Sequence, residues 1–205
     1  TQESTWSVGA RLQEESRGKE YHFFSGKGLH NQSVDLGYTH KSGFYVSGGY
    51  TRNDNGGWQG DKTGREKQWH PKEQSMVNGT VGIQRNNLNA WYRLDFTDED
   101  ILGPLNPSNP KNPDEVRDKD FLSKRYTHQL QADWKVSNRV MLNAALSYQD
   151  YSRRTQTTAT DLATGEKWLT DGDSDQDLTQ YKAWMARATA VWTLSPKLSF
   201  QPGIE

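Results

Sequence analysis

The amino-acid sequence predicts an all-β protein, an antiparallel up-and-down meander of about nine strands. Apolar and polar residues alternate with period two along nine segments, as expected of strands that have one apolar and one polar face. Short and long connections alternate between these segments. Only 32% of the 205 residues are hydrophobic, whereas 11% are aromatic. This composition disfavours a conventional helical or α/β core.

The strands are predicted from the positions of their apolar residues. The clearest segment is 126–136, where Leu130 and Ala132 alternate with Gln129 and Gln131. The same pattern resumes in 140–149 after a two-residue turn at Ser137 and Asn138. No segment gives a helix that we would predict. In chain order, the predicted strands are 5–13, 33–40, 44–51, 76–84, 88–96, 126–136, 140–149, 180–193 and 197–204.

The lengths of the connections predict where the loops lie. The short connections are tight turns made of turn-forming residues, at 41–43, 85–87, 137–138 and 194–196. The long connections are 14–31, 52–75, 97–124 and 152–178. Because every second connection of a meander lies at the same end of the sheet, all short turns should lie at one end and all long loops at the other. This layout is typical of transmembrane β-barrels of the outer membrane.

The aromatic residues support a membrane-spanning sheet. Tyr126 and Trp134 are eight residues apart on one strand, or about 26 Å, and strand tilt reduces this to about 20 Å across the membrane. That span is close to the apolar band of about 25 Å between two aromatic girdles. We therefore expect one set of side chains to face lipid and another to face the lumen. The lipid-facing set is Leu130, Ala132, Leu142, Ala144 and Leu146, and the lumenal set is Gln129, Gln131, Asn143 and Ser147.

The strand count and the ends of the sequence suggest a part of a larger barrel. Single-chain bacterial barrels close with an even number of strands, and an open sheet of nine leaves two unpaired edges. The strand pattern continues to the last residues, and the sequence starts at Thr1 without a basic and apolar leader. We expect either a removed signal or a piece of a longer protein, with a sheet that runs on beyond both ends.

Composition and motifs exclude several classes of function. A net charge of −1 argues against nucleic-acid binding. The absence of cysteine excludes disulfides and thiolate metal sites. The sequence contains no phosphate-binding glycine loop, no nucleophile elbow and no HExxH motif, so we do not expect an enzyme.

Several stretches resemble the barrel portion of TonB-dependent outer-membrane receptors. These are 89–95 (NAWYRLD), 125–131 (RYTHQLQ), 147–154 (SYQDYSRR) and the hairpin 33–50 followed by 53–58 (NDNGGW). The resemblance implies that 1–205 is a partial barrel domain from the outer membrane of a Gram-negative bacterium. Members of that family have a plug, a TonB box and about 22 strands, whereas this chain shows neither plug nor box. The implied function is energised uptake of a scarce nutrient such as a ferric siderophore, haem or cobalamin. The implied partners are outer-membrane lipid, the nutrient ligand and, through the plug, the TonB complex.

Aromatic and basic residues of the long loops are candidate ligand-binding residues. Exposed aromatic and arginine side chains are the usual anchors of recognition. The same residues are equally suited to pack the loops onto one another. The candidates are Trp58, Arg65, Trp69, His70, Arg153, Arg154 and Trp168.

An acidic run at 171–177 is a candidate calcium site. Carboxylates at every second position can converge on Ca²⁺ when the backbone curls. An EF-hand is excluded, because counting from Asp171 puts Lys182 at the twelfth position, where a carboxylate is needed. A solvated acidic loop without a metal is the other interpretation. The candidate ligands are Asp171, Asp173, Asp175 and Asp177.

Two other functions fit the same pattern. The first is a different outer-membrane barrel, a porin-like channel without energy coupling. The second is a soluble all-β carbohydrate-binding module whose exposed tryptophans stack on sugars. Dependence on detergent separates the second of these from a membrane barrel.

Overall fold

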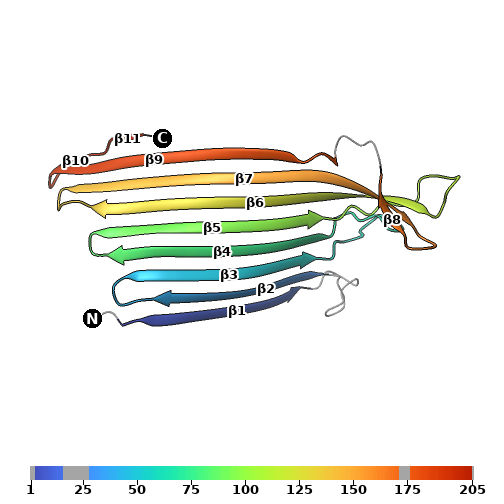
Figure 1. The fold of residues 1–205 in the computed structure, drawn as a ribbon, viewed down its shortest axis with the longest axis horizontal. Coiled ribbons are helices and arrows are strands. Elements are labelled where there is room, and N and C mark those ends of the chain that lie inside the picture. Colours follow the sequence, from blue (N-terminus) through green and yellow to red (C-terminus); the bar gives the residue numbers. More distant parts are fainter. Residues whose placement is uncertain (1–2, 16–27, 171–175, 205) are drawn as a thin grey trace.

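The computed structural model describes residues 3–15, 28–170 and 176–204, which form one antiparallel β-sheet (Figure 1). None of the described residues belongs to a helix that could span a membrane. The long strands are β1 (Thr5–Glu15), β2 (Leu29–Thr39), β3 (Phe44–Asn55), β4 (Lys72–Arg85), β5 (Leu88–Ile101), β6 (Glu115–Lys135), β7 (Val140–Asp161) and β9 (Thr179–Ser195). The short strands are β8 (Lys167–Leu169), β10 (Leu198–Phe200) and β11 (Gly203–Ile204).

Strands that follow one another in sequence also lie side by side in the sheet. The order is β1-β2-β3-β4-β5-β6-β7-β9-β10, and every pair is antiparallel. β11 pairs with the same strand as β10, so the two pieces together form the ninth strand, and β8 adds to the end of β7. The predicted nine-strand up-and-down meander is therefore confirmed. The sheet is open, with β1 at one edge and β10 and β11 at the other.

The tight turns lie together at one end of the sheet, opposite the longer connections (Figure 1). The turn between β2 and β3 is closed by the Gly43 N–H, which donates to the His40 carbonyl at 2.8 Å. Gly43 has a φ of 88°, and a Cβ atom there would lie 1.9 Å from the Gln84 carbonyl oxygen. Only glycine fits this position, because other residues rarely adopt a positive φ and the neighbouring backbone leaves no space.

Apolar and polar side chains lie on opposite faces of the sheet. The register pairs Leu130 with Leu146 and Ala132 with Ala144 on one face, and Asp133 with Asn143 on the other. The same alternation holds in β9, where Ala186 is opposite Leu146. The predicted apolar and polar sets thus lie on opposite faces, as expected from the period of a strand.

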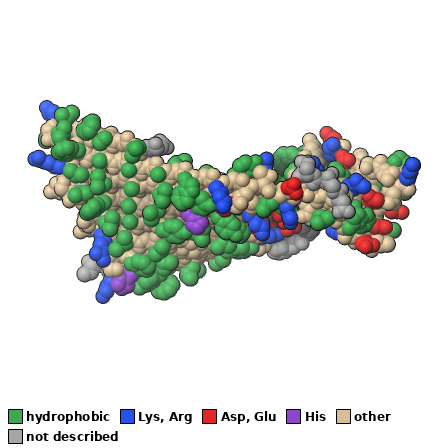
Figure 2. Space-filling view, turned by 45° about the horizontal axis from the view of Figure 1, so that its top comes forward, with side chains coloured by type: hydrophobic (Ala, Val, Ile, Leu, Met, Phe, Trp, Pro, Cys, Tyr) green, Lys and Arg blue, Asp and Glu red, His purple; other side chains and the backbone are tan. Residues whose placement is uncertain are grey.

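No second layer of the described chain covers the apolar face. Val8 is 75% exposed, Trp184 is 69% exposed and Leu130 is 48% exposed. Among the described residues, Val116 and Ala159 are the only buried hydrophobic side chains. Figure 2 shows hydrophobic side chains in rows over the broad part of the molecule, with the acidic ones gathered at the narrow end. The sheet therefore has no conventional core.

The strands continue well past the ends that alternation predicts. β5 runs to Ile101 and β6 begins at Glu115, and β7 extends to Asp161. The prediction that 97–124 and 152–178 are loops is therefore wrong for 97–101, 115–124 and 152–161. Shorter parts of the predicted loops, at 14–15, 29–31, 52–55, 72–75 and 167–169, are strands as well. The extensions of β5, β6 and β7 carry polar residues on both faces, so their period of two cannot be seen in hydropathy. Backbone pairing continues through them without a register shift.

Two regions of the sheet are named below. The belt is the part nearer the tight turns: 5–10, 34–39, 44–50, 77–85, 88–96, 126–135, 140–150 and 182–195. The rim begins with the paired row that runs from Arg11 on β1 to Tyr181 on β9 and extends away from the tight turns. It comprises 11–15, 29–33, 51–55, 72–76, 97–101, 115–125, 151–161 and 179–181, with the connections 56–71 and 102–114.

Candidate functional site

A polar row crosses the rim on the face opposite the apolar side chains. Antiparallel register places its members side by side on eight strands, from β1 to β7 and on to β9. The row is Gln13, Asn31, Asn53, Gln74, Glu99, Ser123, Arg153 and Thr179. Two hollows open on this row, one rich in amides and one rich in arginine and tyrosine.

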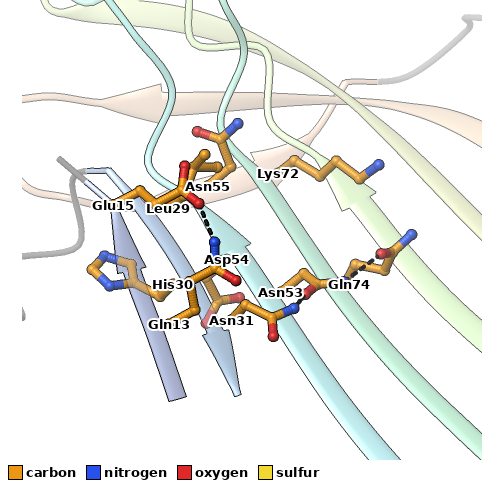
Figure 3. Close-up of a pocket in the computed structure, with 10 residues that line it drawn as sticks. All are labelled: Gln13, Glu15, Leu29, His30, Asn31, Asn53, Asp54, Asn55, Lys72 and Gln74. Atoms are coloured by element: carbon orange, nitrogen blue, oxygen red, sulfur yellow. Dashed lines mark hydrogen bonds between the residues drawn. The ribbon is translucent and has the colours of Figure 1, made fainter. Parts of the chain in front are cut away.

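The amide half of the row is joined by side-chain hydrogen bonds (Figure 3). Asn31 Nδ2 donates to Asn53 Oδ1, and Asn53 Nδ2 donates to Gln74 Oε1 at 3.0 Å. Gln74 Nε2 donates to Glu99 Oε2 at 2.7 Å, and the same Glu99 oxygen lies 2.6 Å from Lys72 Nζ. The hollow beside these amides has a volume of about 370 Å³. Amide side chains make up much of its lining, and the carboxylates of Glu15 and Asp54 and the ammonium group of Lys72 line it as well.

At the other half of the row, Arg153 belongs to an arginine–tyrosine cluster with Arg125, Tyr151 and Tyr181, which lie in a neighbouring paired row on the same face. The two tyrosine rings stack with centroids 6.2 Å apart and planes 24° apart. The Arg125 guanidinium lies 5.0 Å from the centroid of Tyr151, and that of Arg153 lies 5.7 Å from the centroid of Tyr181. Each cation therefore faces an aromatic ring, which is a favourable cation–π arrangement.

A groove of about 560 Å³ runs beside this cluster. Tyr151, Arg153 and Arg154 line it, together with Lys119 and Phe121. Phe121 is 44% exposed there. The groove thus combines aromatic surface with the guanidinium groups of Arg153 and Arg154, and Glu99 and Asp177 are the carboxylates in its lining.

Trp58 and Trp69 hold the connection between β3 and β4 as a small hairpin. Each donates its backbone N–H to the other's carbonyl, at 2.9 and 3.0 Å. Their rings meet edge to face with centroids 6.0 Å apart. These tryptophans therefore pack against each other within one loop.

Arg65 joins three parts of the rim. Its guanidinium donates to both carboxylate oxygens of Asp118, at 2.8 and 2.7 Å, and to the Leu105 carbonyl at 2.8 Å. Its backbone N–H donates to Asn106 Oδ1 at 2.7 Å. The same connections are joined at His70, whose Nδ1 lies 3.1 Å from the Leu102 carbonyl oxygen. These contacts tie 56–71 to 102–114 and to the start of β6.

The predicted ligand-binding residues therefore fall into two groups. Arg153 and Arg154 come together at the groove. Trp58, Arg65, Trp69 and His70 lie in contacts between and within loops, and Trp168 in β8 is paired with Ala159 and is 42% exposed. Ligand binding by any of them stays a prediction.

The sequence interpretation missed Arg125, Tyr151 and Tyr181. A usable signal was present in the hairpin that turns at Ser137 and Asn138. Extending its register outward from the Trp134–Leu142 pair puts Arg125 opposite Tyr151. Hydropathy alone does not predict this pairing, because the alternation of apolar and polar residues stops before Arg125 and Tyr151.

The proposed calcium ligands are only partly within the described chain. Asp171, Asp173 and Asp175 lie outside the described residues, whereas Asp177 lines the groove. Within the described ranges, no group of three or more His, Asp or Glu side chains is placed to hold a metal ion. Calcium binding by the acidic run stays a prediction.

Burial raises the pKa values of Asp100 and Asp120 at the rim, whereas hydrogen bonds lower that of Asp161. Burial raises the pKa of Asp120, although the Gly103 N–H that donates to it at 3.0 Å acts in the other direction. The backbone N–H groups of Thr164 and Ala163 lower the pKa of Asp161, to which they donate at 2.9 and 2.8 Å. Asp120 lies in the packed part of the rim and Asp161 at its exposed end.

Comparison with known protein families, curated proteins and solved structures finds no match for this chain.

Proposed function

We propose that this chain forms part of the wall of an outer-membrane β-barrel that takes up a scarce nutrient as a receptor of the TonB-dependent kind. The observation that carries the proposal is the two-faced sheet. One face of the belt is apolar and uncovered, and the other is polar along the same strands. The energy coupling and the nutrient class rest on the resemblance of the strand sequences.

The exposed apolar face is the strongest argument for lipid contact. Soluble proteins rarely expose apolar patches larger than a few hundred Å². Here the uncovered side chains extend across the sheet from Trp6 and Val8 on β1 to Trp184 and Trp192 on β9. Exposure to water costs about 25 cal/mol per Å² of apolar area. Acyl chains remove that cost, so the bilayer takes the place of a core.

The change in chemistry at the rim supports the same orientation. On the apolar face, Tyr50, Phe96 and Tyr126 are followed toward the rim by charged residues. Arg52 there lies 2.8 Å from Glu73, and Lys124 lies 3.2 Å from Asp98. Charged pairs beyond an aromatic row belong at the level of lipid headgroups and water. In this orientation the longer connections face the outside and the tight turns face the periplasm.

The edges of the sheet are consistent with a barrel wall. A bilayer offers no hydrogen-bond partners to the backbone, so a membrane-spanning sheet must close. β1 and the β10–β11 edge therefore need partner strands, and closure of the barrel provides them.

Site-directed labelling tests lipid contact directly, because the chain has no cysteine of its own. Leu142→Cys and Ala144→Cys place a probe on the apolar face, and Asn143→Cys and Ser147→Cys place it on the polar face. With a fluorophore on each thiol, nitroxide-labelled lipids should quench the first pair strongly and the second pair weakly. Equal quenching at all four positions in the membrane-bound protein would overturn the membrane assignment and favour a soluble module.

A further inference from the structure

The two guanidinium groups of the arginine–tyrosine cluster differ in their partners from three other arginines of the described chain. Arg52, Arg65 and Arg93 each lie within 2.8 Å of a carboxylate oxygen. Arg125 and Arg153 form no ion pair with the described residues and instead lie over tyrosine rings. A guanidinium that stacks on a ring still presents N–H groups at the edge of its own plane. These groups can bind an oxyanion through two parallel hydrogen bonds.

The charges around the groove favour an anion. Its basic lining residues are Lys119, Arg153 and Arg154, and its acidic ones are Glu99 and Asp177. Glu99 is already bound by Lys72 Nζ at 2.6 Å and by Gln74 Nε2 at 2.7 Å. The positive charge of the arginines is therefore compensated only in part by the described residues, and an anion would be drawn to this end of the row.

The aromatic surface favours a ligand that also has a flat ring. Phe121 and Tyr151 line the groove, and Phe121 is 44% exposed. Tyr181, which is opposite Tyr151 in register, is 50% exposed and lies next to the groove residues. Exposed ring faces and edges bind another ring by offset stacking or edge-to-face contact. The volume of about 560 Å³ is in the usual range for small-molecule sites.

We propose that this groove binds a ligand that carries a carboxylate on an aromatic ring. Arg153 in the groove and Arg125, which lies beside it over Tyr151, bind the carboxylate, and Tyr151 and Phe121 contact the ring. The inference rests on the proposed function, because it assigns the ligand class to the polar, lumenal face of the barrel wall at its outer end. The amide half of the row takes no part in binding the charged group.

Calorimetric titration of the full-length, lipid-embedded protein tests the ligand class with three probes. Terephthalate has two carboxylates on an aromatic ring, cyclohexane dicarboxylate has the same charge on a saturated ring, and inorganic phosphate has charge without a ring. We expect terephthalate to bind at least about tenfold more tightly than either of the others. Equal affinity for cyclohexane dicarboxylate and terephthalate would overturn the ring specificity, and equal affinity for phosphate would overturn the ligand class.

Variants test the assigned residues. Arg153→Gln and Arg125→Gln should each weaken terephthalate binding about tenfold or more, because each loses charged hydrogen bonds. Arg153→Lys keeps the charge and should still weaken binding, because the planar fork is lost. Arg187→Gln, on the polar face of the belt, is the matched control and should bind as the parent does. Equal binding by all four variants would overturn the assignment.

The lipid-quenching experiment separates failure of this inference from failure of the proposed function. Absence of terephthalate binding in a protein whose Leu142→Cys and Asn143→Cys probes show the expected quenching contrast would overturn the ligand site alone. Terephthalate binding with the expected losses in the arginine variants, but without a quenching contrast, would overturn the membrane function and leave the groove as a binding site.

Discussion

The belt and the rim share the same strands and the same backbone ladder, yet they are stabilised in different ways. In the belt, Leu130 and Leu146 are paired on an uncovered face, and Asp133 and Asn143 are paired on the other. In the rim, both faces are polar, and side-chain bonds such as that between Arg65 and Asp118 join the strands and connections. The belt therefore depends on what lies outside the protein, whereas the rim depends on contacts within it.

This difference separates two requirements that are usually met together in a sheet. A strand needs backbone partners, and a protein needs somewhere to place its apolar surface. The rim strands meet the first requirement without an apolar face, and they contain the two buried hydrophobic side chains of the described residues, Val116 and Ala159. The belt meets the first requirement and leaves the second to the surroundings. Substitutions in the two regions should therefore have effects of different size and kind.

The largest effect is expected from a charge placed on the apolar face of the belt. Leu142→Arg should destabilise the bilayer-embedded protein by about 2–4 kcal/mol, because hydrocarbon cannot solvate a guanidinium. Asn143→Arg, on the adjacent position of the polar face, should be nearly neutral. Unfolding titrations from bilayers measure both costs. Equal costs at the two positions would contradict the assignment of faces.

The next largest effect is expected from the clamp at the rim. Arg65→Gln should cost about 1–2 kcal/mol, since it removes a two-point bond and leaves Asp118, whose side chain is only 18% exposed, without its cation. Hydrogen exchange should show easier opening at 115–120, with no change at 142–148. Arg117→Gln is the control, because Arg117 is 63% exposed and pairs with Glu115 at the surface. Equal loss of protection in the belt would show that the two regions open as one unit.

A smaller effect is expected where the rim meets the end of the apolar face. Arg52→Gln removes bonds to Asp54 and Glu73, and the side chains of Arg52 and Glu73 are 32% and 52% exposed. Such surface pairs contribute about 0.2–1 kcal/mol. The loss should shrink in high salt, which screens exposed charges. A loss that does not change with salt concentration would show that packing of the arginine stem, and not its charge, stabilises this position.

The smallest effect is expected in the pH dependence of the rim. Burial raises the pKa of Asp120, so the stability it contributes is fully present below its unfolded pKa of about 3.9 and is lost as pH rises through the folded value. Asp120→Asn should flatten the pH profile of unfolding in that interval. Asp161 has a lowered pKa, and its contribution is present above the unfolded value and lost as pH falls through the folded one. Asp161→Asn should therefore change the profile in the opposite direction, and changes of the same sign would contradict both shifts.

The belt could be predicted from the sequence because its two faces differ in hydropathy. The alternation of Leu142, Ala144 and Leu146 with Asn143 and Ser147 is enough to predict both a strand and its orientation. Tight turns such as 41–43 then predict which strands pair. The fold class and the order of the strands follow from these two signals alone.

The rim could not be predicted in the same way. Asp98, Glu99 and Asp100 are typical of loops, because acidic residues are depleted in strands. In the structure their negative charges are balanced across the sheet, where Lys124 lies 3.2 Å from Asp98 and Lys72 lies 2.6 Å from Glu99. Bases that lie far away in sequence cannot be recognised as partners until the register is known. Arg153 could be predicted as a candidate from its residue type alone. Tyr151 and Tyr181 could not, because they come together only through the register of β7 and β9.

The neighbour-to-neighbour order of the sheet also determines how it can assemble. Every pairing in the main path joins strands that are neighbours in the chain, with only the short β8 between β7 and β9, so no pairing needs a crossover between distant parts of the chain. Low contact order of this kind favours fast folding, because little loop entropy is lost before each hairpin forms. The β6–β7 hairpin has a two-residue turn signal and an unbroken ladder from Trp134 and Leu142 to Glu115 and Asp161. We expect it to form first, as a template onto which the flanking strands add one at a time in both directions.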